Sequence, residues 1–195
     1  MKLVILDRDG TINVDSDAYI KSPQEWLPLP GALHAIAQLN HGGWHVVIAT
    51  NQSGLGRGLF GVADLNAMHA KMNKMLAAVG GRVDAIFYCP HAADEGCACR
   101  KPKSGLFEQI GERFGVDLVG VPVVGDSLRD LQAGAIVGCQ PHLVLTGKGQ
   151  AFRGQALPES FPLGTLVHED LAAFAEFLLA QADPDEALRA EPRWL

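Results

Sequence analysis

Two aspartates near the beginning of the chain, Asp7 and Asp9, have a type and a spacing that suit shared chemistry. They follow an apolar run and stand two residues apart, so in an extended segment both side chains project to the same side. Two carboxylates this close repel each other unless a cation lies between them or one is protonated. Asp126, in a second polar cluster, offers a third carboxylate. Three oxygen donors with room for water suit Mg²⁺.

A carboxylate beside such a metal can attack phosphorus and form an aspartyl-phosphate. A neighbouring carboxyl group can protonate the leaving oxygen and afterwards activate a water molecule. The alternative for each aspartate taken alone is that it caps a turn or a helix. Because polar clusters follow three separate apolar runs, we favour a phosphoryl-transfer site over a set of unrelated caps.

A second group of donors stands between residues 89 and 99. Cys89, His91, Cys97 and Cys99 form a C-x-H-x5-C-x-C array. Three thiols and an imidazole are a common structural Zn²⁺ set, and four protein ligands leave no open position for catalysis. The alternatives are three free thiols in a flexible loop or a disulfide, and a reducing compartment disfavours the disulfide. Cys139 lies in an apolar stretch and is interpreted as a buried core cysteine.

The elements that must position these residues can be predicted from the apolar pattern. Continuous apolar runs, typical of buried strands, alternate with segments whose apolar residues recur at helical spacing. We predict strands at 3–6, 44–50, 83–88, 121–125 and 141–146, with a further short strand near Leu166. We predict helices at 31–43, 62–81, 104–115, 128–138 and 169–182. This order predicts an α/β fold with a doubly wound, mainly parallel, Rossmann-like sheet. We expect one domain over residues 1–182 and a surface tail at 183–195.

In such a sheet, ligands bind outside the carboxyl ends of the strands. The first predicted strand runs into DRDGT (7–11), and the second runs into TNQSGLGRG (50–58). The third runs into the cysteine loop (89–101), and the fourth runs into GDSLRD (125–130). The polar clusters are therefore predicted to meet at one edge of the sheet.

Composition limits the partners of the protein. The net charge is −6 and there is no long basic run, so we expect no nucleic-acid partner. The apolar run at the beginning is too short for a signal-peptide core and no later stretch reaches the length of a membrane span, so we expect a cytoplasmic protein without a membrane partner. His34, His45 and His69 stand at predicted helix or strand positions and are interpreted as structural. We expect a monomer.

DRDGT, TNQSG, RKP and GDSLRD, in this order, resemble the four motifs of the haloacid dehalogenase (HAD) superfamily of phosphatases. The resemblance covers residues 3–146, and the ordered set is highly specific. It implies that Asp7 is the nucleophile and Asp9 the general acid/base. It implies a catalytic Mg²⁺ held by Asp7, Asp126 and the backbone carbonyl of Asp9, with Asp130 in support. The implied phosphate- and substrate-binding residues are Thr50, Asn51, Gln52, Ser53 and Lys101.

Many members of this superfamily carry an inserted cap domain, but the gaps between the motifs here are too short to hold one. Specificity must then come from the loops at 13–26 and 53–58 and from the cysteine segment. Within 53–58, the glycines either form an ordinary turn or bring backbone amides and Arg57 toward an anion. We interpret the structural Zn²⁺ as fixing a loop that substitutes for the cap.

Two families of phosphatases in the superfamily share such a zinc loop leading into CRKP. LDRDGTINVD and TNQSGLGRG resemble the D-glycero-D-manno-heptose 1,7-bisphosphate 7-phosphatases, whereas histidinol-phosphate phosphatases usually carry Asp where Ser53 stands. The resemblance implies hydrolysis of the C7 phosphate of a small phosphorylated sugar in nucleotide-activated heptose biosynthesis. Arg57 and Arg100 are candidates for binding a second phosphate. Ser127 departs from the Lys that the heptose enzymes often carry.

Three alternative functions stay open. The first is a histidinol-phosphate phosphatase, and the second is a nucleic-acid end phosphatase, because some of these share a TNQ…G…GRG segment. The third belongs to a different class: a non-catalytic, zinc-bearing interaction module on a degenerate phosphatase fold. The presence of every expected catalytic residue argues against this third alternative.

Overall fold

The chain folds around a six-stranded parallel sheet in the strand order β3-β2-β1-β4-β5-β6. The computed structural model describes residues 1–182. The strands are β1 (Leu3–Leu6), β2 (His45–Asn51), β3 (Ala85–Cys89), β4 (Pro122–Gly125), β5 (Gln140–Val144) and β6 (Leu166–His168). The predicted α/β architecture with a doubly wound sheet is confirmed. The proposed surface tail at 183–195 lies outside the described residues, and the single domain over 1–182 stays a prediction.

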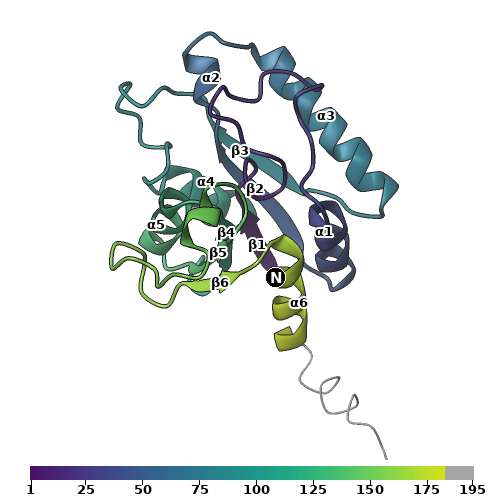
Figure 1. The fold of residues 1–195 in the computed structure, drawn as a ribbon, viewed down its shortest axis with the longest axis vertical. Coiled ribbons are helices and arrows are strands. Elements are labelled where there is room, and N and C mark those ends of the chain that lie inside the picture. Colours follow the sequence, from purple (N-terminus) through teal and green to yellow (C-terminus); the bar gives the residue numbers. More distant parts are fainter. Residues whose placement is uncertain (183–195) are drawn as a thin grey trace, which may run out of the picture.

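Helices cover both faces of the sheet, as Figure 1 shows. On one face lie α1 (Ala32–His41), α3 (Val62–Ala78) and α6 (Leu171–Ala182), and on the other lie α4 (Gly105–Phe114) and α5 (Leu128–Ile136). Side chains along a strand alternate between the faces, so Val4 and Leu6 join the first core while Leu3 and Ile5 join the second. Burial on both faces explains why the strands are apolar throughout.

Two short helices differ from the sequence prediction. The α2 helix (Ser53–Gly56) occupies part of the segment that was expected to be a loop, and a 3₁₀ helix, η1 (Gly147–Phe152), follows β5. Gly56 brings α2 against the cysteine loop, because its N–H donates to the Pro90 carbonyl at 2.8 Å. A Cβ at position 56 would lie 2.8 Å from that same oxygen, so the close approach requires glycine.

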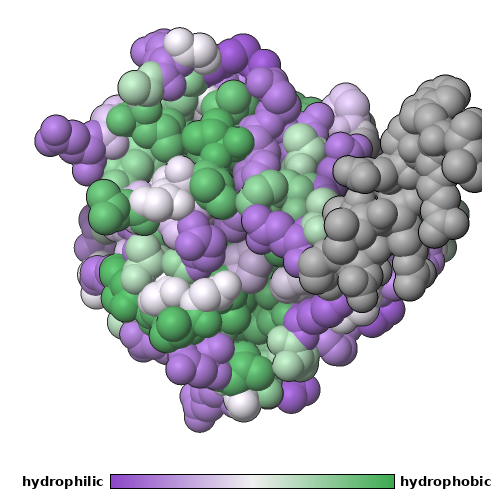
Figure 2. Space-filling view, turned by 90° about the horizontal axis from the view of Figure 1, so that it is seen from below, coloured by the Kyte–Doolittle hydropathy of each residue, from purple (hydrophilic) through white to green (hydrophobic). Residues whose placement is uncertain are grey.

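The opposite edge of the sheet, where the strands begin, carries no predicted chemistry. Figure 2 views the molecule from below and shows hydrophobic patches separated by polar side chains. Near β6, the exposed apolar residues include Leu163, Leu166 and Val167. No helix within residues 1–182 is long and apolar enough to cross a membrane.

Candidate active site

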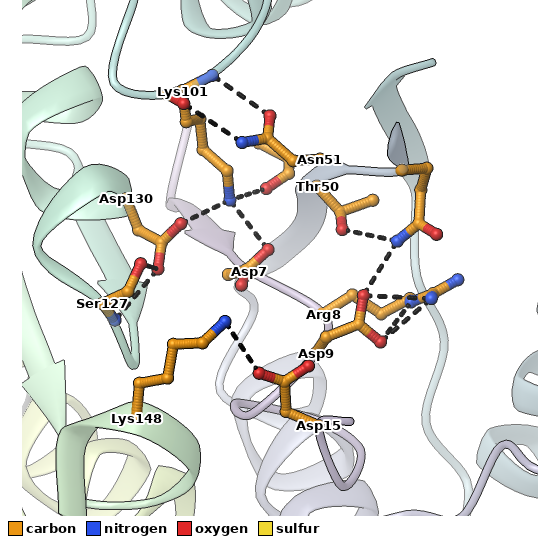
Figure 3. Close-up of polar contacts among 12 residues, drawn as sticks. Asp7, Arg8, Asp9, Asp15, Thr50, Asn51, Lys101, Ser127, Asp130 and Lys148 are labelled. Carbon is orange, nitrogen blue, oxygen red and sulfur yellow. Dashed lines mark hydrogen bonds and ion pairs between the residues drawn. The ribbon is translucent and has the colours of Figure 1, made fainter. Parts of the chain in front are cut away.

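Asp7, Lys101 and Asp130 form a buried charged cluster at the carboxyl ends of the central strands (Figure 3). The Lys101 ammonium lies 2.7 Å from Asp7 Oδ1, 2.7 Å from Asp130 Oδ1 and 2.7 Å from the Ala49 carbonyl. These three acceptors match the three donors of an ammonium group. Burial alone would lower the Lys101 pKa, but the two carboxylates outweigh burial and raise it above its ordinary value. Lys101 is therefore a fixed positive charge beside Asp7.

Asp7, Asp126 and Asp130 form a compact group that could hold a cation. Each can place one carboxylate oxygen so that all three lie within 4.8 Å of one another. Burial and the negative charge of Asp130 raise the Asp7 pKa to about 7, although Lys101 opposes them. Burial, Asp130 and Asp7 raise the Asp126 pKa to about 8. These carboxylates are difficult to ionise together because they are buried and their negative charges repel one another. A divalent cation would neutralise them, and Mg²⁺ prefers such oxygen ligands.

Asp9 lies beside this group, but its carboxylate faces a different set of partners. The Arg8 guanidinium binds it from Nη2 at 2.9 and 3.0 Å, Asn13 Nδ2 donates at 2.9 Å, and Gln52 Nε2 donates at 2.8 Å. Burial disfavours the charged form, yet Arg8 and these hydrogen bonds hold the Asp9 pKa below its ordinary value. Asp9 was predicted to reach the metal through its backbone carbonyl, and these contacts leave that prediction open.

The second motif contributes residues with different surroundings. Thr50, Asn51, Gln52 and Ser53 all line the cavity that contains Asp7. Gln52 Nε2 donates to Thr50 Oγ1 at 3.0 Å as well as to Asp9. The Asn51 amide is bound at both ends to the Lys101 backbone, at 3.1 Å each. Asn51 thus joins the end of β2 to the loop that carries Lys101.

The cavity holds about 250 Å³ and has a cationic rim. Arg100 lines it, whereas Arg57 is exposed and is not among its lining residues. Sequence reasoning missed two further cations, Arg129 and Lys148. Arg129 stands inside the GDSLRD motif, and Lys148 follows the carboxyl end of β5. Position at a strand end was the signal that could have identified Lys148.

Lys148 also connects three parts of the site. Its backbone N–H donates to Asp126 Oδ2 at 2.8 Å, and its ammonium lies 3.0 Å from Asp15 in the 13–26 loop. Gly147 precedes it with φ +49°, and a Cβ there would collide with the Asp126 carboxylate and the Gly10 backbone. The η1 turn is therefore packed directly against the candidate metal site (Figure 3 draws Lys148 and Asp15).

The four predicted zinc ligands come together at the end of β3. Cys89 Sγ lies 3.6 Å from His91 Nδ1 and 3.6 Å from Cys97 Sγ, and His91 Nδ1 lies 3.3 Å from Cys99 Sγ. Tetrahedral Zn²⁺ with Zn–S near 2.3 Å and Zn–N near 2.0 Å places neighbouring donors about 3.5 to 3.8 Å apart. The donor set and its spacing therefore fit zinc. All four cysteines, Cys139 included, are free thiols, and Cys139 is buried as predicted.

Comparisons with known proteins agree with this geometry. The polynucleotide kinase 3 phosphatase family model matches residues 2–126, and the HAD-hydrolase-like model matches residues 98–174. Fold, motifs and family models together define the class: a phosphatase with the HAD hydrolase fold, that is, a phosphoric monoester hydrolase.

The chain is 61% identical to D-glycero-beta-D-manno-heptose-1,7-bisphosphate 7-phosphatase of Bordetella bronchiseptica, over 93% of this chain and 100% of that protein. It is 55% identical to the enzyme of the same name from Pseudomonas aeruginosa, over 91% of this chain and 97% of that protein. A crystal structure of D,D-heptose 1,7-bisphosphate phosphatase from B. bronchiseptica, complexed with magnesium and phosphate, superposes with a TM-score of 0.89 and covers 93% of this chain and 99% of that one. The chain belongs to the D-glycero-beta-D-manno-heptose-1,7-bisphosphate 7-phosphatase family.

Proposed function

We propose that the protein is a Mg²⁺-dependent phosphatase that hydrolyses the C7 phosphate of D-glycero-D-manno-heptose 1,7-bisphosphate. The observation that supports the substrate is the 61% identity over the full length of a phosphatase of that name. The observation that supports the mechanism is the position of Asp7, whose carboxylate lies 2.7 Å from the buried Lys101 ammonium. Heptose activation for glycan synthesis, a cytoplasmic location and a monomeric state are part of the same proposal.

Asp7 acts as the nucleophile. One of its oxygens forms a bond to phosphorus while the bond between phosphorus and the C7 oxygen of the sugar breaks, which gives an aspartyl-phosphate and the leaving alkoxide. Lys101 holds Asp7 and places positive charge beside the phosphoryl oxygens. Asp7, Asp126 and the backbone carbonyl of Asp9 would hold Mg²⁺, which would supply positive charge against the oxygens of the transferring phosphoryl group.

Asp9 moves the proton in both halves of the reaction. Protonated Asp9 gives its proton to the leaving alkoxide, and the resulting carboxylate then takes a proton from the attacking water. Water attacks phosphorus, the acyl-phosphate bond breaks, and inorganic phosphate and the Asp7 carboxylate are released. The contacts from Arg8, Asn13 and Gln52 favour ionised Asp9, which suits the second half. The negative charge of a bound phosphate favours the protonated form that the first half needs.

The cationic rim is proposed to bind the second phosphate of the substrate. Arg100 and Arg129 both line the cavity, and they also border a neighbouring cavity formed by the zinc loop. Arginine binds phosphate through paired donors, so two guanidinium groups at this rim suit a phosphate at the far end of a bisphosphate. We assign this role to Arg100 and Arg129 and not to Arg57, because Arg57 is exposed and does not line the cavity.

Zn²⁺, bound by Cys89, His91, Cys97 and Cys99, is proposed to be structural. The loop it fixes leads directly into Arg100 and Lys101. Arg100 Nη1 also donates to the His91 carbonyl at 3.3 Å, so the guanidinium is tied to a zinc ligand. Holding this loop in one conformation places both cations before the substrate arrives.

A substrate panel tests the proposal. Phosphate release with Mg²⁺ is measured for both C1 anomers of the heptose bisphosphate, for histidinol phosphate and for a 3′-phosphorylated oligonucleotide. The oligonucleotide is included because the polynucleotide kinase 3 phosphatase model matches residues 2–126. We expect the highest kcat/KM for one heptose anomer and no turnover by Asp7→Asn. Faster hydrolysis of either alternative substrate would refute the substrate assignment, and an active Asp7→Asn would refute the mechanism.

The rim is tested with arginine variants. Arg100→Ala and Arg129→Ala should each raise KM for the bisphosphate about tenfold and leave KM for a heptose 7-monophosphate within about twofold. Arg113→Ala removes an exposed arginine at the end of α4 and serves as the control. If each substitution raised KM equally for both substrates, Arg100 and Arg129 would not bind the second phosphate.

A further inference from the structure

Arg8 is a buried cation that enters the reaction described above only through its contact with Asp9. Its side chain is fully buried, between the two motif aspartates in sequence. A buried guanidinium must have its donors satisfied. Nε and Nη2 donate to the Asp9 carboxylate, and Nη1 lies 3.3 Å from Nε2 of His69 (Figure 3 shows the Arg8–Asp9 contact).

His69 is the unexpected partner in this arrangement. It lies on the core face of α3, 61 residues from Arg8, among Leu65, Met68 and Met72. Arginine has only donors, so Nε2 of His69 must accept this hydrogen bond and the ring must be neutral with its proton on Nδ1. The ring therefore fixes one end of the guanidinium plane, while Asp9 takes the other end.

We propose that His69 is a positioning residue for Asp9, acting through Arg8. The guanidinium is planar and rigid, so fixing Nη1 against the ring fixes the direction from which Nε and Nη2 reach the carboxylate. That direction sets how Asp9 faces the leaving oxygen. The inference rests on the proposed acid/base role of Asp9.

The Arg8 guanidinium differs from the other two partners of Asp9, because one rigid group reaches both carboxylate oxygens. Asn13 and Gln52 each bind through a single amide nitrogen, Asn13 to Oδ1 and Gln52 to Oδ2. A single hydrogen bond permits rotation of the carboxylate about the donor, whereas the guanidinium contacts both oxygens at once. Removing the His69 acceptor should let the guanidinium turn and should carry the carboxylate with it.

A leaving-group comparison separates this role from simple packing. The p-nitrophenolate ion leaves without a proton, whereas a sugar alkoxide needs one from Asp9. The value of kcat/KM covers the steps up to departure of the leaving group and excludes the later attack of water. Of the two proton transfers assigned to Asp9, it therefore reports only the first. His69→Leu removes the acceptor, and His69→Gln keeps an acceptor oxygen on a side chain of similar length. Met72→Leu is a volume-conserving change one turn along the same helix and serves as the packing control.

With the heptose bisphosphate, or the primary sugar phosphate that the panel identifies, His69→Leu should lose about 10- to 100-fold in kcat/KM. With p-nitrophenyl phosphate the loss should stay within about threefold, because that reaction needs no acid. His69→Gln should recover most of the lost kcat/KM. Met72→Leu should leave the ratio of kcat/KM values for the two substrates unchanged. Equal losses on the two substrates, or no loss on either, would overturn the inference.

Asp9→Asn distinguishes the two levels of the argument. If Asp9→Asn lowers kcat/KM selectively for the sugar phosphate and His69→Leu does not, the proposed function stands and this inference fails. If Asp9→Asn affects both substrates equally, the acid role itself fails, and with it this inference. If His69→Leu does not fold, His69→Phe provides the second variant. Its ring fills similar space without an acceptor nitrogen for Arg8 Nη1, so it should show the same leaving-group-selective loss.

Discussion

Asp126→Asn removes one of the clustered carboxylates while keeping the shape of the side chain and an acceptor for the Lys148 N–H. In the metal-free protein, the Asp126 pKa is raised from 3.8 to about 8. A raised aspartate pKa means that the folded protein holds a proton that the unfolded chain has already released, so stability falls as the pH rises from about 4 toward the folded pKa. Asp7 contributes in the same direction up to about pH 7.

The size of the effect follows from the shift. About four pKa units at 1.36 kcal/mol each give a ceiling of about 5 kcal/mol at pH 8. Water and counterions that enter the cavity screen part of this, so we expect metal-free Asp126→Asn to exceed the wild type by about 2 to 4 kcal/mol at pH 8. Near pH 5 both carboxyls of the wild type are largely protonated, and the difference should shrink to below about 1 kcal/mol.

The assay is urea unfolding at pH 5, 7 and 8, with chelator and with saturating Mg²⁺. Mg²⁺ should stabilise the wild type by about 3 kcal/mol at a hundredfold excess over its Kd and should stabilise Asp126→Asn far less. Asp94→Asn, an exposed aspartate in the cysteine loop, controls for net charge. The free energy of unfolding of the metal-free wild type and of Asp126→Asn could instead change equally between pH 5 and pH 8, or increase equally with Mg²⁺. Either result would refute the idea that Mg²⁺ binding relieves repulsion among these carboxylates.

Three further predictions concern other parts of the site. Lys101→Met leaves Asp7 and Asp130 without their buried cation. We expect the free energy of unfolding, measured in urea, to fall by about 3 to 5 kcal/mol, and kcat, measured by single-turnover kinetics, to fall by at least about 10²-fold. Near-wild-type values would contradict the assigned role. Gly147→Ala forces a Cβ against Asp126, so the Mg²⁺ concentration for half-maximal activity should rise at least about tenfold, whereas Gly154→Ala, with a similar φ but open space, should leave it unchanged. Cys99→Ser should lower the melting temperature, expose residues 89–101 to protease and raise KM more than it lowers kcat. Unchanged kinetics in a folded, zinc-free protein would show that the loop does not contribute to substrate binding.

The sheet and the convergence of its motifs could be predicted because both depend on local patterns. Continuous apolar runs indicate strands buried on both faces, and the edge at which parallel strands end is fixed by topology. The zinc ligands were predictable for a similar reason, since all four lie within eleven residues and their spacing is visible in the chain. The α2 and η1 helices were missed because segments of four and six residues are too short to display a helical period.

Contacts between distant residues could not be predicted from the sequence. The binding of the phosphoryl group by Asn51 stays a prediction. Both ends of its amide are hydrogen-bonded to the backbone of Lys101, fifty residues further along. His69 was interpreted as structural, and its contact with Arg8 spans 61 residues. Such pairings depend on how α3 and the loops pack against the sheet, and no local pattern records them.

The central place of β1 in the sheet affects how the protein can be made. During synthesis, β2 and β3 can pair on one side of β1 while the other side waits for β4 at residues 122–125. Until then Asp7 lacks its hydrogen bond to the Val124 carbonyl, and Asp126 and Lys148 have not left the ribosome. A nascent chain of about 120 residues therefore exposes an unpaired parallel edge and has an incomplete site for the metal. Such a chain could pair with other chains along that edge, and it could not yet hydrolyse its substrate.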